Sequence, residues 1–198
     1  MEQLNDKIKL VSKLIKDNNW ETMSIDDDIV SQRKYLPGSN IGAFRSYGFV
    51  NADVSTICNS IWNIYTHSDL IKQYDLDVIH YEIVSNINKN TRLCYQINQL
   101  PMPLWSRDLV YLQTYIVDKD ISYILMYSVE TNSRPKLPDK YVRAIIDISA
   151  YVIIPSNKGC IVHRIGHIDP QGLIPSFIIN QYVGKTAKII KLLKKIYT

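Results

Sequence analysis

Apolar and polar positions recur with a period near 3.6 at the start of the chain. Leu4, Ile8, Val11 and Leu14 fall on one face of such a helix, and lysines occupy other positions around it. Residues 2–17 are therefore expected to form an amphipathic helix that packs on a sheet through its apolar face.

A second helical pattern occupies the end of the chain. Ile174-Pro175 is a favourable helix start, because proline is tolerated in the first turn. The residues that follow combine an apolar stripe with a lysine-rich face, which predicts one long terminal helix. The stripe comprises Phe177, Ile178, Tyr182, Ile189, Leu193 and Ile196, and the other face comprises Lys185, Lys188, Lys191 and Lys195.

Between these helices the pattern is mainly that of strands. Short runs rich in β-branched and aromatic residues are separated by turn residues, which predicts a long antiparallel meander rather than alternating β and α units. One internal helix is expected from about Val54 to Tyr65, capped by Asn51 or Asp53. The expected strands are residues 29–35, 44–50, 78–84, 92–99, 108–117, 123–129, 143–154 and 160–167, with a short helix or turn at 68–74.

Two prolines mark a sharp corner between two of these strands. Pro101 and Pro103 donate no backbone hydrogen bond, so the preceding strand must end there or lie at an edge. Arg107 and Asp108 then open the next strand. Charged neighbours at this position are expected to tie the corner through hydrogen bonds rather than to meet a ligand.

The corner is also the first of several segments that match a known family. Residues 100–115, LPMPLWSRDLVYLQTY, resemble the P-x-P-x-x-x-R-D-x-V-Y-L signature of the START family of lipid-transfer domains, most closely its phosphatidylcholine-transfer branch. Other segments resemble family positions in the family's order. They are LPGS at 36–39, AFR at 43–45, YVRA at 141–144, YVIIP at 151–155 and DPQGLIP at 169–175. Residues 1–198 are therefore expected to form a single START-like domain.

The resemblance implies an α+β helix-grip fold. In this fold a curved antiparallel sheet wraps around a long C-terminal helix, and one lipid is held in an internal tunnel between them. By the same likeness residues 130–140 correspond to a lid loop, whereas composition alone also allows a plain connector. The implied function is lipid binding and lipid transfer at membranes, with a phospholipid favoured over a sphingolipid or a sterol.

The residues with which the family contacts its ligands are only partly kept. Where the phosphatidylcholine branch has an arginine and an aspartate at the phosphate, this sequence has Ile71 and Asp75, so only the acid remains. The aromatic residues that enclose choline match Gln96, Leu109 and Asp147, so the cation–π cage is absent. Neither feature supports a choline headgroup.

The steroidogenic branch offers no better match. It places a glutamate and an arginine in its tunnel, and the matching positions hold Cys94 and Gln113. We expect instead a polar tunnel end built from Gln96, Gln113, Asp147 and Asp75, suited to a hydroxyl- or amide-bearing headgroup, although Asp147 could simply face water. The complete predicted lipid-binding set is Asp75, Cys94, Gln96, Leu109, Tyr111, Gln113, Asp147, Phe177 and Tyr182.

The strand at 92–99 presents a conflict between pattern and resemblance. Alternation by itself would turn the apolar set that begins at Leu93 toward the interior. The family alignment instead turns Cys94, Gln96 and Asn98 inward. We follow the alignment, because a sheet that is covered on both sides buries both faces.

Composition narrows the class of protein. With 198 residues, 46% of them apolar and 21% charged, the chain suits one domain with a large core. A net charge of +4 is too weak to indicate a nucleic-acid partner. The three cysteines, Cys58, Cys94 and Cys160, lack CxxC spacing, so we expect buried thiols and neither a disulfide framework nor a metal or other cofactor.

The chain lacks the patterns of membrane insertion. No apolar run reaches the roughly 18–20 residues of a membrane span, and the first residues lack the core of a signal peptide. A cytoplasmic monomer that contacts membranes peripherally and transiently is expected. The lysines of the terminal helix would each contribute about 1 kcal/mol on an anionic surface, or they only solvate its outer face. Trp105 and Phe177 are candidates for an exposed aromatic residue near the tunnel mouth.

Two other functions stay open. The same grip fold hosts cyclases and hydrolases, but the sequence contains no G-x-S-x-G elbow and no helical H-x-x-x-H pair, so we expect no enzyme. His163 and His167 share a strand face and could supply two metal ligands, although a hydrogen-bonded pair is the simpler interpretation. A lipid-gated interaction module would contain the same tunnel, and sequence does not separate sensing from transfer.

Overall fold

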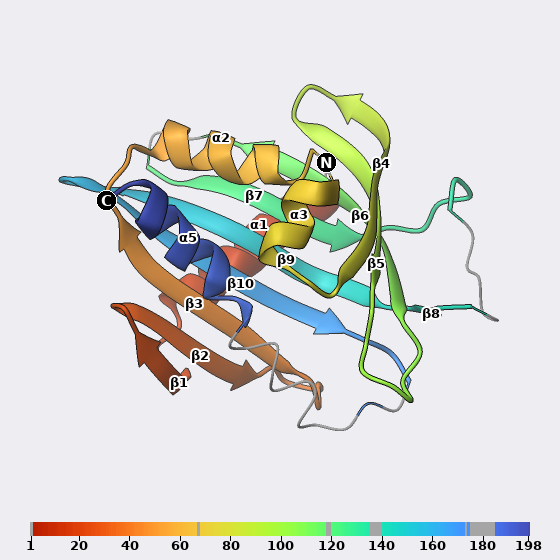
Figure 1. Ribbon diagram of the computed structural model, residues 1–198. Coiled ribbons are helices and arrows are strands. Elements are labelled where there is room, and N and C mark those ends of the chain that lie inside the picture. Colours follow the sequence, from red (N-terminus) through yellow and green to blue (C-terminus); the bar gives the residue numbers. More distant parts are fainter. Residues whose placement is uncertain (1, 67, 118–119, 135–139, 173, 175–184) are drawn as a thin grey trace.

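One large antiparallel sheet organises the chain (Figure 1). The computed structural model describes residues 2–66, 68–117, 120–134, 140–172, 174 and 185–198. The strands follow the spatial order β1-β2-β3-β10-β9-β7-β6-β5-β4, and β8 pairs with β6 in parallel. Their bounds are β1 Glu21–Asp26, β2 Ile29–Tyr35, β3 Gly42–Val50, β4 Val78–Asn88, β5 Thr91–Asn98, β6 Arg107–Ile116, β7 Ser122–Ser128, β8 Val142–Arg143, β9 Ile145–Ser156 and β10 Gly159–Asp169.

Helices cover both faces of this sheet. The described helices are α1 Glu2–Lys16, α2 Val54–Ile64, α3 Ser68–Tyr74 and α5 Lys188–Ile196. Figure 1 shows α2, α3 and α5 on the concave side of the curved sheet and α1 on the opposite side. We refer to the side of α2, α3 and α5 as the inner face and to the side of α1 as the outer face.

The two faces bury separate cores, because successive residues of a strand point to opposite sides. On β7, Ile124 and Met126 belong to the inner core, whereas Tyr123 and Leu125 belong to the outer core. The outer core receives the apolar stripe of α1, including the fully buried Val11. The sequence pattern of residues 2–17 therefore predicted both the helix and its packing face.

The C-terminal helix packs closely on β3. Ile189, Ile190 and Leu193 of α5 are buried in the inner core. A Cβ at Gly48 of β3 would lie 3.3 Å from Ile190, so the missing side chain at this position allows the close approach. The predicted terminal helix is confirmed over Lys188–Ile196, and its expected first part, residues 175–184, lies outside the described residues.

Most predicted elements match the structure within a few residues. The helix predicted after Asp53 is α2, and the Asp53 carboxylate accepts a hydrogen bond from the Thr56 backbone at 2.9 Å, which confirms the cap. The strand β1 was not predicted. All six of its residues are exposed, so its sequence, ETMSID, carries no alternation of buried and exposed positions. The strand predicted at 143–154 is also divided, because Ala144 separates β8 from β9.

The proline corner is tied as expected. The Arg107 guanidinium donates to the backbone oxygens of Pro170 at 2.7 Å and Gln171 at 2.9 Å, which joins the start of β6 to the end of β10. Asp108 is fully buried, and the Arg143 guanidinium donates to both of its carboxylate oxygens, at 3.0 and 2.7 Å. Both charged neighbours therefore hold the corner in place.

The structure also resolves the conflict over β5. Cys94 lies in the inner core, as the family alignment required. Leu93, Tyr95 and Ile97 are buried as well, but they form a separate outer cluster with Val110 of β6. In the described part of the chain, this outer cluster is covered by neighbouring residues that include Val129 and Tyr141 rather than by a helix, so both faces of β5 are buried.

Candidate functional site

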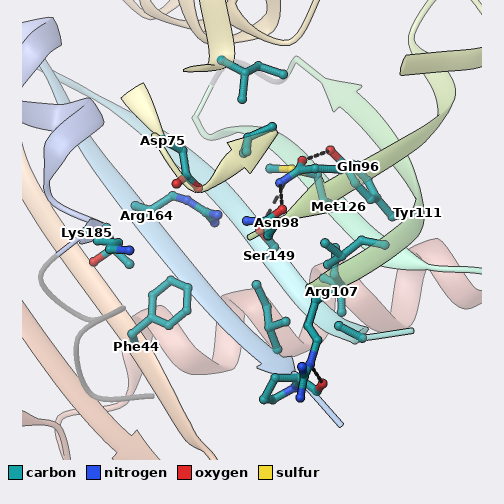
Figure 2. Close-up of a pocket in the computed structure, with 18 of the residues that line it drawn as sticks. Phe44, Asp75, Gln96, Asn98, Arg107, Tyr111, Met126, Ser149, Arg164 and Lys185 are labelled. Atoms are coloured by element: carbon teal, nitrogen blue, oxygen red, sulfur yellow. Dashed lines mark hydrogen bonds between the residues drawn. The ribbon is translucent and has the colours of Figure 1, made fainter. Parts of the chain in front are cut away.

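A cavity of about 220 Å³ lies between the inner face of the sheet and the elements that cover it (Figure 2). Its wall is mainly apolar and includes residues from α2, α3, the inner strands and the start of the C-terminal segment. Representative apolar lining residues are Ile71, Leu109, Met126, Ile146, Ile168 and Ile189. An apolar enclosure with a few polar groups is the usual form of a small-molecule site.

Three polar side chains on the adjacent strands β5 and β6 form one hydrogen-bonded set. The Tyr111 hydroxyl donates to Gln96 Oε1 at 2.9 Å, and Gln96 Nε2 donates to Asn98 Oδ1 at 2.7 Å (Figure 2). Burial raises the pKa of Tyr111 well above its usual range, so this hydroxyl stays protonated and remains a donor. The set presents amide and hydroxyl groups to the cavity without a charge.

The most distinctive polar group is Arg164 of β10. Its side chain reaches into the cavity, and its guanidinium carbon lies 4.6 Å from the ring centroid of Tyr151 and 5.7 Å from that of Phe44. One terminal nitrogen donates to the backbone oxygen of Ile165 at 2.9 Å. Within the described part of the chain, no carboxylate forms an ion pair with Arg164. Aromatic rings therefore position a cation that has no carboxylate of the described residues within ion-pair distance.

An acidic group lies in the same cavity at the end of α3. Asp75 accepts a hydrogen bond from the Asp77 backbone at 3.2 Å. Burial is the main cause that raises the pKa of Asp75, and the nearby Asp77 carboxylate adds to the shift, whereas Lys185 and Lys188 oppose it. Asp77 itself forms an ion pair with Lys185. The Asp75 carboxyl therefore lies in surroundings that disfavour its ionised form.

The remaining charged residues of the wall are the cations Arg33, Arg107 and Lys188. Arg33 is 2.9 Å from Glu21, and Arg107 is bonded to backbone oxygens at the corner. Lys188 lies on the exposed side of α5. Counted with Arg164 and Lys185, these cations outnumber Asp75 among the charged residues that line the cavity. The cavity is therefore electropositive and suits a ligand with a negative charge.

Apart from Asp147, the predicted site residues divide into three groups. Asp75, Gln96, Leu109 and Tyr111 line the cavity. Cys94 and Gln113 lie farther along the same inner strand faces and are fully buried, outside the described cavity lining. Phe177 and Tyr182 lie outside the described residues.

The two deeper residues bond to neighbours on the sheet. The Cys94 sulfur is 3.2 Å from the Tyr81 hydroxyl. Gln113 Oε1 accepts from Arg92 Nε at 2.7 Å, and Gln113 Nε2 has no hydrogen-bond partner among the residues that the structure describes. Arg92 in turn stacks over Trp62, with its guanidinium carbon 3.9 Å from the ring centroid. A buried arginine, Arg92, therefore lies at this end of the sheet. The comparison with family positions in the sequence did not identify it.

Asp147 does not belong to the cavity lining, so its predicted place in the tunnel is wrong. A β-bulge between β9 and β10 causes this: His167 pairs with Ile148 and Ile168 pairs with Ile146, which leaves Asp147 as the extra residue. Its carboxylate lies 2.7 Å from His167 Nδ1, and its side chain is 45% exposed. The alternative that Asp147 faces water is therefore the correct one.

The two histidines of β10 have separate surroundings. His163 stacks on Tyr47 with ring centroids 5.2 Å apart, whereas His167 is hydrogen-bonded to Asp147 and to Ser39. In the described ranges, no three His, Cys, Asp or Glu side chains converge as a metal site would require. The simpler interpretation of His167 as a hydrogen-bonded residue is confirmed.

Sequence reasoning did not identify Arg164 or Tyr151 as cavity residues, whereas the family alignment had turned Asn98 inward, and Asn98 lines the cavity. Arg164 stands between His163 and Ile165 in a strand where both faces are buried, so alternation carries no signal that separates a cavity residue from an outer one. Tyr151 lay inside a segment recognised for its likeness to the family, and its hydroxyl bonds Tyr65 at 3.0 Å across the cavity wall. Only the pairing of β9 with β10 brings Arg164 and Tyr151 together.

A curved antiparallel sheet that encloses an amphipathic cavity beneath a C-terminal helix defines the helix-grip class of ligand-binding domain. The START domain model matches residues 3–193, and the chain belongs to the START domain family. Among the described residues, no helix is long and apolar enough to cross a membrane.

Curated relatives are similar over part of the chain. START domain-containing protein 10 from Homo sapiens is 27% identical over 142 residues, which are 70% of this chain and 47% of that protein. StAR-related lipid transfer protein 7, mitochondrial, also from Homo sapiens, is 26% identical over 143 residues, 71% of this chain and 38% of that protein. The matched part of the chain thus spans less than half the length of these relatives.

Solved structures confirm the fold. Human StAR-related lipid transfer protein 5 is similar with a TM-score of 0.79 and 16% identity, over 99% of this chain and 96% of that one. The human StarD13 lipid transfer and protein localization domain is similar with a TM-score of 0.73 and 22% identity, over 96% of both chains. At these identities the likeness concerns architecture, and the predicted helix-grip fold is confirmed.

Proposed function

We propose that this chain binds one phospholipid in its inner cavity, shields the acyl chains from water and exchanges the lipid at membrane surfaces. Membership of the START domain family supports lipid binding, and the names of the relatives describe lipid transfer in those proteins. The observation that carries the phospholipid assignment is Arg164, a cation set among aromatic rings in a mainly apolar cavity.

The apolar wall provides affinity but little selectivity. Burying roughly 30 methylenes of a diacyl lipid is worth on the order of 25 kcal/mol relative to water. Relative to a bilayer the gain is near zero, because the chains are already out of water there. Discrimination between lipids must therefore come from the polar groups of the cavity.

We assign the lipid phosphate to Arg164. A guanidinium binds phosphate through charge-assisted hydrogen bonds, and such bonds are strongest where water is excluded. The family position of the missing arginine is Ile71 on α3, so the cation would be supplied here from β10 instead. Asp75 remains in the wall, where burial raises its pKa, and the protonated form of its carboxyl would donate to a phosphate or headgroup oxygen.

The uncharged set on β5 and β6 suits the remainder of the headgroup. Gln96 and Asn98 present amide groups, and Tyr111 holds Gln96 by a hydrogen bond. A headgroup with hydroxyl or amide groups would exchange hydrogen bonds with this set, whereas a choline would meet no aromatic cage there. Leu109 forms part of the apolar wall beside it.

Loading requires the cavity to enlarge. Its volume of about 220 Å³ is below the roughly 300–1,000 Å³ of pockets that enclose drug-sized ligands, and a diacyl lipid is larger still. The side formed by Lys185, Thr186 and Ile189 is attached to the rest of the wall by side-chain contacts, including the ion pair of Lys185 with Asp77. We propose that this side opens to admit the lipid.

Membrane contact is proposed at the proline corner. Met102 is 93% exposed and Trp105 is 55% exposed, and both lie on the loop that leads to Arg107 in the cavity wall. Two of the lysines of α5 are already engaged, because Lys191 pairs with Asp26 and Lys194 with Asp27. A cytoplasmic monomer that visits membranes transiently through this apolar corner is the arrangement we propose.

Native mass spectrometry followed by lipid extraction tests the function. A one-to-one complex with a phosphate-bearing lipid is expected, together with accelerated exchange between vesicles at substoichiometric protein. A protein that takes up only sterol or other uncharged lipid would contradict the phosphate assignment. Binding without accelerated exchange would indicate a lipid sensor instead of a carrier, and a protein that stays empty after incubation with mixed vesicles would refute lipid binding.

A further inference from the structure

Three segments that are far apart in the sequence meet on the outer face beside the rim of the cavity. Ser39 Oγ of the β2–β3 turn lies 3.0 Å from His167 Nε2 of β10. His167 Nδ1 lies 2.7 Å from Asp147 Oδ2 at the bulge of β9. The His167 side chain is only 8% exposed, so its ring is held between these two partners. A hydroxyl, an imidazole and a carboxylate in this order and at these distances have the geometry of a hydrolase triad.

The carboxylate determines which atom carries the proton. Since Asp147 is an acceptor, a neutral His167 must have its proton on Nδ1, which makes Nε2 an acceptor. The Ser39 hydroxyl then donates to Nε2. The Ile41 backbone N–H lies 3.1 Å from Ser39 Oγ and donates to it, and the Ile41 carbonyl oxygen at 3.2 Å is the competing acceptor for the hydroxyl. The protonation that Asp147 imposes is the one in which Nε2 serves as a base.

The local backbone holds the serine in this position. Gly38 has a φ of +77°, a backbone conformation that residues with side chains rarely adopt. The Ser39 backbone N–H donates to the Leu36 carbonyl oxygen at 3.0 Å. Together these features close the turn immediately before Ser39. The hydroxyl is therefore presented by a tight turn rather than by a freely moving loop.

We propose that Ser39, His167 and Asp147 form a nucleophilic site that cleaves carboxylic esters. Ser39 Oγ attacks the ester carbonyl carbon while His167 Nε2 accepts the hydroxyl proton. The bond to the alcohol oxygen breaks, and that oxygen leaves with the proton from Nε2. Water, deprotonated by Nε2, then attacks the acyl-serine, releases the carboxylic acid and restores the hydroxyl. In this scheme Ser39 and His167 are catalytic, and Asp147 is a positioning residue.

The location indicates a lipophilic ester as the substrate. Ile41 and Gly42, which follow Ser39 closely, line the cavity, and so does Ile168, which follows His167. The residues beside Ser39 and His167 thus reach the cavity, so the substrate assigned to this site is an acyl ester that passes between the cavity and the outer face. The reactivity of the triad toward small esters does not depend on lipid binding, so the two proposals are tested separately.

The surroundings predict slow turnover. Asp147 is 45% exposed, and water screens its charge more than it screens the buried carboxylate of an efficient triad. Formation of a covalent adduct is therefore a more sensitive readout than product release. We expect a single adduct that accumulates to near one per protein.

The test is a fluorophosphonate probe, which loses fluoride when a nucleophilic serine oxygen attacks its phosphorus. The purified full chain is incubated with the probe, and the modified residue is identified by intact mass and peptide mapping. We expect modification at Ser39, its loss in Ser39→Ala, and a 10- to 100-fold slower reaction in His167→Gln. Hydrolysis of a p-nitrophenyl ester with a medium-length acyl chain should fall in parallel.

A matched control distinguishes the triad from ordinary surface reactivity. The Ser55 hydroxyl donates directly to Asp53 at 2.6 Å without an intervening imidazole. Ser55→Ala should leave the adduct unchanged. Asp147 is half-exposed, so Asp147→Asn should slow the labelling of Ser39 at least tenfold and leave the melting temperature unchanged. Asp147→Glu should restore part of the labelling rate. Three outcomes would overturn the proposal. They are the absence of an adduct at Ser39, equal labelling of Ser55, and a labelling rate that is unaffected in both Asp147→Asn and His167→Gln.

Discussion

The ring of Phe44 lies directly against Gly166 on the neighbouring strand. β3 and β10 place the two residues opposite each other, and a Cβ at position 166 would fall 2.2 Å from the Phe44 ring atom Cζ. The ring in turn flanks the Arg164 guanidinium at 5.7 Å. The absence of a side chain at one position of β10 therefore determines where the cavity's cation can lie.

Gly166→Ala is expected to destabilise the protein by about 1–3 kcal/mol, because the Phe44 ring must leave its place to admit the methyl group. Each kcal/mol corresponds to roughly 2–4 °C in Tm for a chain of this size. The control is the same substitution in a Phe44→Ala background, where the methyl group meets no ring and should cost much less. An equal cost in the two backgrounds would show that the Phe44 contact is not the cause.

Arg164→Gln is expected to change which lipids are bound rather than whether lipid is bound. Loss of charge-assisted hydrogen bonds worth about 1.5–3 kcal/mol should lower the ratio of phospholipid to uncharged lipid by roughly tenfold or more. Lipid extraction after loading from vesicles of equal phospholipid and diacylglycerol content measures this ratio. Lys158→Gln removes one positive charge on the exposed turn between β9 and β10 and should leave the ratio unchanged. An unaltered ratio in Arg164→Gln would remove the phosphate assignment.

His163 is expected to make the fold sensitive to acid. Burial, with a smaller effect from Arg45, lowers the pKa of His163 to about 4. The folded protein thus keeps the imidazole neutral while the unfolded chain becomes protonated near pH 6.5, so stability falls as the pH decreases from about 6.5 to 4. The loss should approach about 3 kcal/mol at the lower end of this range.

Urea unfolding at pH 7, 5.5 and 4.5 measures this effect. His163→Phe retains a ring beside Tyr47 and should flatten the dependence on pH. His80 is exposed and pairs with Glu82. His80→Gln provides the control and should retain most of the dependence of stability on pH. If His163→Phe kept the full acid sensitivity, other groups would have to account for it.

Asp75 is expected to lower stability at neutral pH. Because burial raises its pKa, the folded state holds the proton more tightly than the unfolded chain does. Stability is therefore highest below the unfolded pKa, decreases as the pH rises through the folded pKa, and stays lower above it. Asp75→Asn should raise Tm at pH 7.5 and have little effect near pH 3.5. A lower Tm at pH 7.5 would mean that attraction to Lys185 outweighs the cost of burial.

Periodicity determined most of the secondary structure. The helical spacing from Leu4 to Leu14 predicted α1 and its packing face, and the turn residues between β-branched runs predicted most of the strands. The motif around Arg107 and Asp108 predicted a hydrogen-bonded corner, and both residues have that role. These features were predictable because each depends on residues that are close together in the chain.

The faces of the strands were harder to predict. The side-chain period of a strand is two, so one extra residue reverses every assignment beyond it. The bulge at Asp147 is such a residue, and it moved a predicted cavity acid to the outer face. For β5 the pattern was uninformative for a different reason, because both of its faces are buried.

The sequence by itself therefore determined the family and most of the order of elements, since local spacing and short motifs carry that information. Only the tertiary structure decided that Arg164 lies between Phe44 and Tyr151, and that Ser39, His167 and Asp147 meet at one place. These groups come from separate strands. Strand register, one bulge and one missing side chain at Gly166 bring them together, and the chemistry of both proposed sites depends on that geometry.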